Sequence, residues 1–238
     1  MMTGEAEGLT GWRSADARPA RVALISTLEA NGYVFLPRHA GDDDVTSVAA
    51  ALGEPIAPWG GTVVQRLVPR EASTPNTYSG LFGLGRFPFH TDLAHWRLPP
   101  RYLVLRCVKG YADVPTLLLD GRSIIDAVSL DILRRSVVRP RRPRSGEMRL
   151  LRLWQPVTGD CDLLRWDEVF LKPASRIGAF AFGKVGEELE SAMPMEVAMV
   201  DAGDTLVIDN WRMLHSRPPV AAGREDRCLD RVYLGRLH

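Results

Sequence analysis

A histidine and an aspartate lie two residues apart in the segment FPFHTDLAHW, residues 87–96, surrounded by apolar and aromatic side chains. His90 and Asp92 are both potential metal ligands, and in an extended segment residues two apart point to the same side of the chain. A single metal ion is therefore within reach of both. The pair alone indicates little, because a His-x-Asp sequence occurs by chance in many proteins.

A third candidate ligand lies far downstream, in the segment GDTLVIDNWRMLHSRPP. Gly203-Asp204 predicts a turn and TLVID a strand, so that His215 follows a central strand and can point into the mouth of a barrel. Two imidazoles and one carboxylate form the facial triad of non-haem Fe(II) oxygenases, which leaves positions open for a chelating cosubstrate and O₂. In the alternative interpretation, Asp92 caps a turn and His215 caps a loop.

Two arginines follow in the segment REDRCLDRVYL. Arg227 and Arg231 are four residues apart, in or entering a predicted strand, so we expect them on the same strand face. If that strand lines a pocket, the two guanidinium groups suit a dianion with two carboxylates. The alternative is a solvated strand face, although the apolar neighbours of Arg231 favour partial burial.

The elements that must position these residues are mostly short strands. Strands are predicted at residues 33–36, 62–68, 101–109, 116–120, 148–154, 195–200, 204–209 and 228–234, and helices at 21–30, 45–52 and 121–136. The Gly-rich residues 80–85 are expected to form a flexible loop. This pattern favours a mainly β fold with flanking helices and a jelly-roll core, and strand–helix alternation is too weak for a doubly wound parallel sheet.

The composition is that of an ordinary globular protein, with 238 residues, 45% hydrophobic and 25% charged. We expect one domain over residues 1–238, with a loose leader at 1–18 and an insertion or lid at roughly 135–190. The net charge of +1 does not indicate nucleic-acid or membrane binding. No apolar run approaches the roughly 20 residues of a membrane span. Three widely spaced cysteines predict reduced thiols in a cytoplasmic protein.

Several motifs in a fixed order resemble the 2-oxoglutarate-dependent dioxygenases of the taurine dioxygenase and clavaminate synthase-like superfamily. They are His90-Thr91-Asp92, Thr116 in DVPTLLLDG, GDTLVIDNWRMLHSR and RCLDRVYL, and NGYVFL and LGEPI near the N-terminus also resemble that family. The resemblance implies a double-stranded β-helix that holds Fe(II) with His90, Asp92 and His215. It also implies 2-oxoglutarate and O₂ as cosubstrates.

The resemblance further implies how the cosubstrate binds. Arg231 matches the family arginine that binds the distal carboxylate of 2-oxoglutarate, Thr116 matches a hydroxyl residue that shares it, and Arg227 matches an arginine near the C1 carboxylate. The family couples decarboxylation of 2-oxoglutarate to succinate and CO₂ with oxidation of a C–H bond, most often as hydroxylation, and also as desaturation, cyclisation or epoxidation. Asp92 argues against the related halogenases, in which a small residue replaces the carboxylate.

We therefore expect an oxygenase acting on a small polar metabolite, in natural-product biosynthesis. Candidate substrate contacts at the barrel mouth are Gln65, Arg86, Trp96 and Trp211. The basic segment 134–149 is expected to be a solvated loop, or alternatively a mobile lid or a docking surface for an acidic or carrier-bound substrate.

Two other classes of protein remain open. One is a catalytically silent jelly-roll binding protein, against which the joint presence of the triad and Arg231 argues. The other is an oxygenase that acts on nucleic acid, or a nucleic-acid-binding module, that uses the basic segment 134–149; the lack of interleaved aromatic residues in that segment argues against it.

Overall fold

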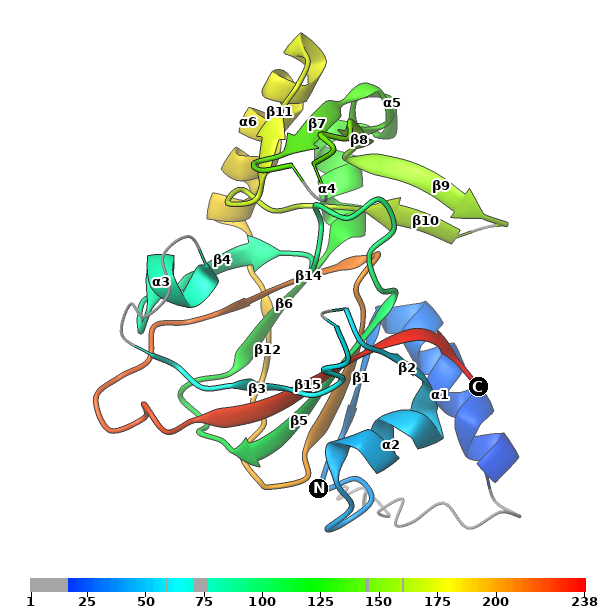
Figure 1. The fold of residues 1–238 in the computed structure, drawn as a ribbon, viewed down its shortest axis with the longest axis vertical. Helices are drawn as coiled ribbons and strands as arrows, with labels where there is room; N and C mark the ends of the chain where they lie inside the picture. Colours follow the sequence, from blue (N-terminus) through cyan, green and yellow to red (C-terminus); the bar gives the residue numbers. More distant parts are fainter. Residues whose placement is uncertain (1–16, 59, 71–76, 144–145, 160) are drawn as a thin grey trace, which may run out of the picture.

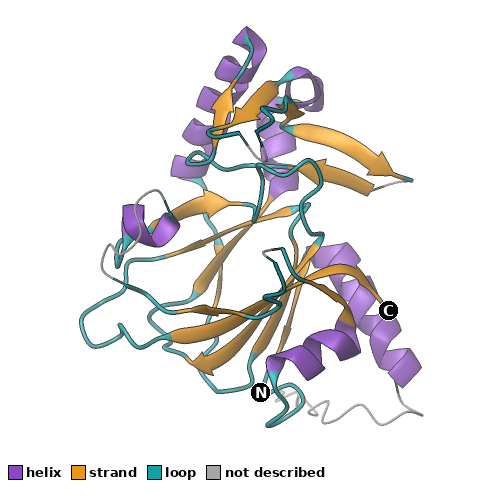
Figure 2. Ribbon diagram, viewed as in Figure 1, coloured by secondary structure: helices purple, strands orange, loops and turns teal. Residues whose placement is uncertain are grey.

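The computed structural model describes residues 17–58, 60–70, 77–143, 146–159 and 161–238, in which two antiparallel sheets form a jelly roll (Figures 1 and 2). The larger sheet contains β1 (Tyr33–Leu36), β13 (Thr205–Asp209), β5 (Tyr102–Lys109), β15 (Cys228–Leu237) and β2 (Gly53–Ile56), with β3 (Gln65–Leu67) also paired to β15. The smaller sheet contains β12 (Met195–Val197), β6 (Thr116–Asp120), β14 (Met213–Arg217) and β4 (Phe87–His90). The predicted mainly β fold is confirmed.

Strand β5 shows how the two faces of the larger sheet are used. Leu103 and Leu105 pack between the sheets with Leu118 of β6. Val104 points to the opposite face and packs against α1 (Ala17–Asn31) and α2 (Val45–Leu52). Side chains alternate between the faces of a strand, so an almost wholly apolar β5 is explained by burial on both sides.

A separate unit of helices and short strands covers the smaller sheet, at the top of Figure 1. It consists of α4 (Gly121–Val128), α5 (Leu130–Arg135), β7 (Val137–Pro140), β8 (Leu151–Arg152), β9 (Trp154–Thr158), β10 (Cys161–Leu164), β11 (Leu171–Pro173) and α6 (Arg176–Ser191). Phe89, Leu119 and Leu214 of the smaller sheet pack against this unit. It contains the segment expected as an insertion, and the chain's division into domains stays a prediction.

Several predicted elements differ from the structure. The helix predicted at 121–136 is two helices, because Ser129 adopts a positive φ of 79° between them. The predicted strand 62–68 is shortened to β3. The prediction of a loop at residues 80–85 is wrong in its first part, because α3 (Tyr78–Phe82) is a short helix.

The N-terminal leader expected at residues 1–18 lies outside the described residues, except that Ala17 and Arg18 belong to α1. All three cysteines are free. In the part of the chain that the structure describes, no helix has the length and apolar character needed to cross a membrane.

Candidate metal centre and its cavity

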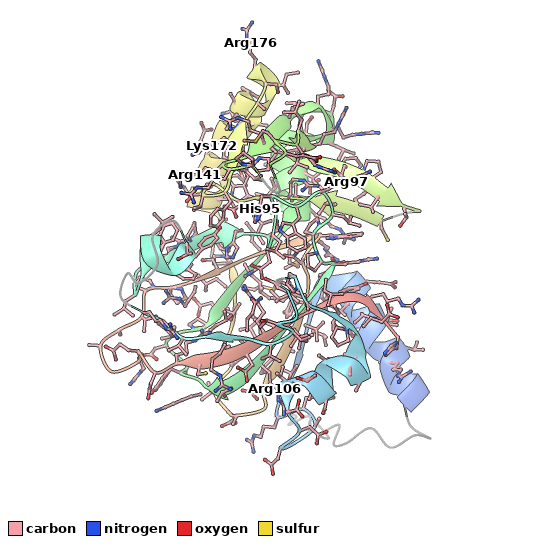
Figure 3. The ribbon with its side chains drawn as sticks, viewed as in Figure 1. His95, Arg97, Arg106, Arg141, Lys172 and Arg176 are labelled. Carbon is pink, nitrogen blue, oxygen red and sulfur yellow. The ribbon has the colours of Figure 1, made fainter. Side chains whose placement is uncertain are left out.

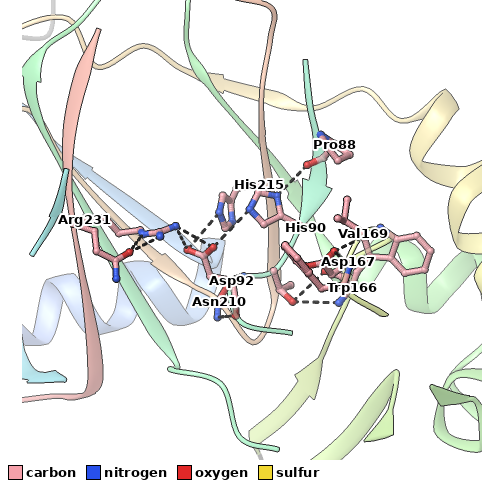
Figure 4. A network of polar contacts seen from close by, with 12 residues as sticks. Pro88, His90, Asp92, Trp166, Asp167, Val169, Asn210, His215 and Arg231 are labelled. Carbon is pink, nitrogen blue, oxygen red and sulfur yellow. Dashed lines mark hydrogen bonds and ion pairs between the residues drawn. The ribbon is translucent and has the colours of Figure 1, made fainter. Parts of the chain in front are cut away.

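The three predicted metal ligands come together at one buried point (Figure 4). Strands β4 and β14 pair so that His90 lies opposite His215, and their ring centroids are 4.4 Å apart. Asp92 Oδ1 lies 3.6 Å from His90 Nε2, and Asp92 Oδ2 lies 3.8 Å from His215 Nε2. The candidate ligand atoms all lie within 4.8 Å of one another. This arrangement suits a single metal ion.

Hydrogen bonds orient two of the ligands. His90 Nδ1 lies 3.0 Å from the carbonyl oxygen of Pro88, and donating its proton there leaves Nε2 with a lone pair for a metal. The side chain of Asn210 holds the backbone of Asp92, accepting from its N–H at 2.7 Å and donating to its carbonyl at 3.0 Å. Asn210 is fully buried and also donates to the carbonyl of Pro100 at 2.9 Å. It therefore positions the carboxylate ligand, a role that the sequence prediction missed.

The electrostatic environment prepares the ligands for a cation. Burial alone would raise the pKa of Asp92, but the Arg231 charge and the contact with His90 hold that pKa well below its ordinary value. Burial, and then the neighbouring His90, lower the pKa of His215 to about 3. For His90, burial lowers the pKa but contact with Asp92 outweighs it, so the pKa is raised. An ionised carboxylate and a neutral His215 are the forms that bind a metal.

The two predicted arginines have different surroundings. Arg231 Nη1 lies 3.1 Å from Asp92 Oδ2, and Arg231 Nε donates to Gln65 Oε1 at 3.0 Å. Arg227 is 5% exposed, and its Nε donates to the carbonyl of Val114 at 3.1 Å. No carboxylate pairs with Arg227 among the described residues. Arg231 thus has an anionic partner within the protein, whereas Arg227 is a buried cation without one.

Arg217 adds a second buried positive charge beside Arg227. Burial, and then the charge of Arg227, lower the pKa of Arg217 to about 10. Its donors are occupied by backbone carbonyls, including those of Gly83 at 3.0 Å and Gly85 at 2.9 Å. Like charges placed together away from water are unfavourable unless an anion joins them. The region around Arg227 is therefore suited to bind an anion.

These groups share one cavity of about 660 Å³. Its wall includes the three candidate metal ligands together with Tyr78, Thr116, Asp167, Phe170, Arg217, Arg227 and Arg231. Fe(II) with a dicarboxylate fits this donor set, because two imidazoles and a carboxylate face the ion and a buried guanidinium is left for the second anion. The predicted convergence of His90, Asp92, His215, Thr116, Arg227 and Arg231 is thus observed.

The four predicted substrate contacts do not line the cavity. Gln65 reaches it only through its bond to Arg231. Arg86 is exposed above the ring of Phe89, and the Trp96 carbonyl accepts a hydrogen bond from Arg165 at 2.6 Å. Trp211 is 9% exposed and donates through Nε1 to the carbonyl of Pro99, so that it packs rather than faces a ligand.

The cavity is lined instead by Tyr78, Asp167 and Phe170, none of which the sequence prediction selected. Asp167 and Phe170 belong to the covering unit, in the segment between β10 and β11. Their position beside the metal centre depends on long-range packing that no local pattern indicates.

No family model matches the chain, but solved structures resemble it. An asparagine oxygenase in complex with Fe(II), 2S,3S-3-hydroxyasparagine and succinate has a TM-score of 0.70 at 19% identity, covering 91% of this chain and 79% of that one. The non-heme iron oxygenase OrfP in complex with Fe, succinate and (3S)-hydroxy-L-Arg has a TM-score of 0.70 at 22% identity, covering 93% and 80%. PvcB from Pseudomonas aeruginosa, an Fe, α-ketoglutarate dependent oxygenase from an isonitrile synthetic pathway, has a TM-score of 0.65 at 19% identity, covering 94% and 84%. The chain therefore has the jelly-roll fold of iron- and α-ketoglutarate-dependent oxygenases.

Proposed function

We propose that the chain is an Fe(II)- and 2-oxoglutarate-dependent dioxygenase that hydroxylates, or otherwise oxidises, a small polar metabolite in natural-product biosynthesis. The observation that carries the proposal is the convergence of His90, Asp92 and His215 in one cavity with the guanidinium of Arg227, which no carboxylate of the described residues pairs with. The similar oxygenases, which bind iron, a keto acid or a hydroxylated amino acid, support it.

In this proposal His90, Asp92 and His215 hold Fe(II), with Asn210 fixing the backbone of Asp92. When bound, Fe(II), 2-oxoglutarate and O₂ together supply the oxidant for a substrate C–H bond and release succinate and CO₂. The protein's own contribution is to place both reactants in a buried cavity, hold the carboxylate ligand ionised and limit access of water.

We assign the distal carboxylate of 2-oxoglutarate to Arg227 and Thr116, and this reverses the roles of the two arginines that the family resemblance implies. Arg231 is already paired with Asp92 at 3.1 Å, so its positive charge is balanced within the protein. Arg227 has no carboxylate partner among the described residues, and it bonds to Val114, two residues before Thr116. Arg231 instead keeps Asp92 ionised and oriented next to the metal.

The substrate in this proposal is a free small molecule. No residue of the basic segment 134–149 lines the cavity, and Arg141 is exposed at the edge of the covering unit (Figure 3), which gives no support to a carrier-bound substrate. A catalytically silent binding protein is not favoured, because it would not need the buried triad and the buried cation together. A cytoplasmic location stays a prediction.

The test is anaerobic addition of Fe(II) and 2-oxoglutarate. A keto acid that chelates iron gives a visible charge-transfer absorption, which we expect in the wild type and not in His215→Ala. His238→Ala serves as a control, because it removes an exposed histidine that is not part of the triad. Full absorption by a folded His215→Ala variant would overturn the assignment of the metal ligands.

A further inference from the structure

Asp167 is a buried carboxylate in the cavity wall without a cationic partner. Its exposed fraction is 2%, and no Lys, Arg or His forms an ion pair with it among the described residues. Burial outweighs the hydrogen bonds and the neighbouring His90, so the pKa of Asp167 is raised. An ionised carboxylate in such a place is unfavourable until a positive charge or a set of donors joins it.

The hydrogen bonds of Asp167 leave one of its oxygens for a ligand. The backbone N–H groups of Val169 and Phe170 both donate to Oδ1, each at 2.8 Å, which fixes the side chain in a turn. No hydrogen bond of normal geometry reaches Oδ2 from the described residues. The carboxylate is thus held at Oδ1 by the backbone, with the Tyr78 hydroxyl as its neighbouring side-chain donor, and Oδ2 is the oxygen left to face a ligand.

The neighbouring residue ties this turn to the metal centre. The Thr91 N–H donates to the carbonyl of Trp166 at 2.8 Å, and the Trp166 N–H donates to Thr91 Oγ1 at 3.2 Å. Since Thr91 lies between the candidate ligands His90 and Asp92, one backbone–backbone hydrogen bond and one hydrogen bond to the Thr91 hydroxyl fix the position of Asp167 relative to those ligands (Figure 4). A rigidly placed group binds a ligand without an ordering cost.

Aromatic rings complete the surroundings of Asp167. The Tyr78 ring stacks on His90 with centroids 4.5 Å apart and meets the Phe170 ring edge-on at 5.3 Å. The Tyr78 hydroxyl is buried beside the Asp167 carboxylate and forms no hydrogen bond of normal geometry among the described residues; burial, followed by the charge of Asp167 and the contact with it, raises the pKa of Tyr78. Aromatic faces attract cations, most strongly where water is excluded.

We propose that Asp167, Tyr78 and Phe170 form a recognition site for a protonated amine, so that the substrate is a small amine-bearing metabolite. The carboxylate neutralises the ammonium group, and the Tyr78 and Phe170 rings enclose it beside His90. The amine site is distinct from the anion site at Arg227, and both line the same cavity. This inference rests on the proposed oxygenase function, because it names a substrate class for that site.

The experiment measures binding rather than turnover. The anaerobic complex with Fe(II) and 2-oxoglutarate is titrated with the proteinogenic L-amino acids and with their N-acetyl derivatives. Binding is followed by calorimetry and by the change in the visible absorption. We expect at least one free amine to bind and its acetylated form, which lacks the charge, to bind at least tenfold more weakly.

Asp167→Asn tests the carboxylate directly. Asparagine keeps an oxygen that accepts from Val169 and Phe170, so the turn is retained while the charge is lost. We expect amine affinity to fall by about 10- to 100-fold, the effect of losing a charge-assisted hydrogen bond, with unchanged 2-oxoglutarate absorption. Glu168→Gln is the matched control, because it removes the adjacent, exposed carboxylate and should leave affinity unchanged.

Three results would overturn the amine site. They are the absence of binding by every free amine, equal binding of amines and their acetylated forms, and unchanged amine affinity in Asp167→Asn. The last would show that the carboxylate only supports its turn. If instead the wild type gave no absorption with Fe(II) and 2-oxoglutarate, the proposed function would fail.

Discussion

Replacing Arg227 by Gln distinguishes the role of Arg227 from that of Arg231, which lines the same cavity. Arg227 is buried, and among the described residues its side chain hydrogen-bonds only to the carbonyl of Val114, so we expect it to be available to a carboxylate of 2-oxoglutarate. In the absence of ligand, the substitution removes one bond to a carbonyl but also relieves the repulsion between Arg227 and Arg217. We therefore expect little change in the stability of the ligand-free protein and a large loss of cosubstrate affinity.

The size of the effect follows from the contact. A charge-assisted hydrogen bond contributes about 1.5–3 kcal/mol, so the dissociation constant of 2-oxoglutarate should rise roughly 10- to 150-fold. At about 100 times its dissociation constant, the ligand stabilises the wild type by about 2.7 kcal/mol, or about 5–11 °C for a chain of this length. With 30-fold weaker binding, the same concentration gives about 0.9 kcal/mol, or about 2–4 °C.

Thermal unfolding under anaerobic conditions with Fe(II), with and without 2-oxoglutarate, measures this difference. Arg224→Gln is the control, because Arg224 is only half-buried and pairs with Asp113 at 3.1 Å outside the cavity. Arg231→Gln tests the alternative assignment, in which Arg231 binds the distal carboxylate of 2-oxoglutarate. We expect this variant instead to bind iron more weakly, even in the absence of 2-oxoglutarate, because Asp92 loses its partner. The reasoning is refuted if Arg227→Gln keeps the full stabilisation by 2-oxoglutarate and Arg231→Gln loses it with normal iron affinity.

Two further variants test the positioning of Asp92 and the packing between the two sheets. Asn210→Ala leaves the N–H and carbonyl of Asp92 without their partners, so we expect a loss of a few kcal/mol in the free energy of unfolding and about 10- to 100-fold weaker Fe(II) binding, measured by denaturant unfolding and by chelator competition. Normal iron affinity would show that Asn210 does not position the ligand. Leu206→Ala creates a cavity at a fully buried position of β13, and we expect a loss of about 2–5 kcal/mol with unchanged iron affinity in the folded protein. A loss below about 1 kcal/mol would contradict the packing between the sheets.

The metal ligands could be predicted from the sequence because their signals are local. His90 and Asp92 lie two apart in an extended segment, and His215 follows a readable strand. The pairing that places His215 opposite His90 joins segments more than a hundred residues apart. That register depends on how the two sheets stack, and no local pattern encodes it. The family resemblance supplied the connection that spacing alone did not.

The covering unit was harder to predict, and α6 shows why. Its buried positions Ala181, Val185 and Leu189 recur every four residues, and Ser175 caps its start by accepting from the Gly178 N–H. These are ordinary helix signals. However, glycines inside the helix lower its intrinsic propensity, and its stability depends on tertiary packing against α4 and α5. Asp167 was missed for a related reason, since long-range hydrogen bonds between Trp166 and Thr91 hold its turn beside the metal centre.

The roles of the charged residues in the cavity depend on pairing, which the sequence does not contain. Asp92 neutralises Arg231, so one negative and one positive charge cancel at the metal side. Arg227 is left as a buried cation, and Asp167 as a buried anion near His90. Neither pairs with the other through the described contacts, so a ligand carboxylate would stabilise the charge of Arg227 and a ligand ammonium group would stabilise an ionised Asp167. The proposed pair of ligands, a dicarboxylate keto acid and an amine-bearing substrate, supplies one carboxylate and one ammonium group for these two sites.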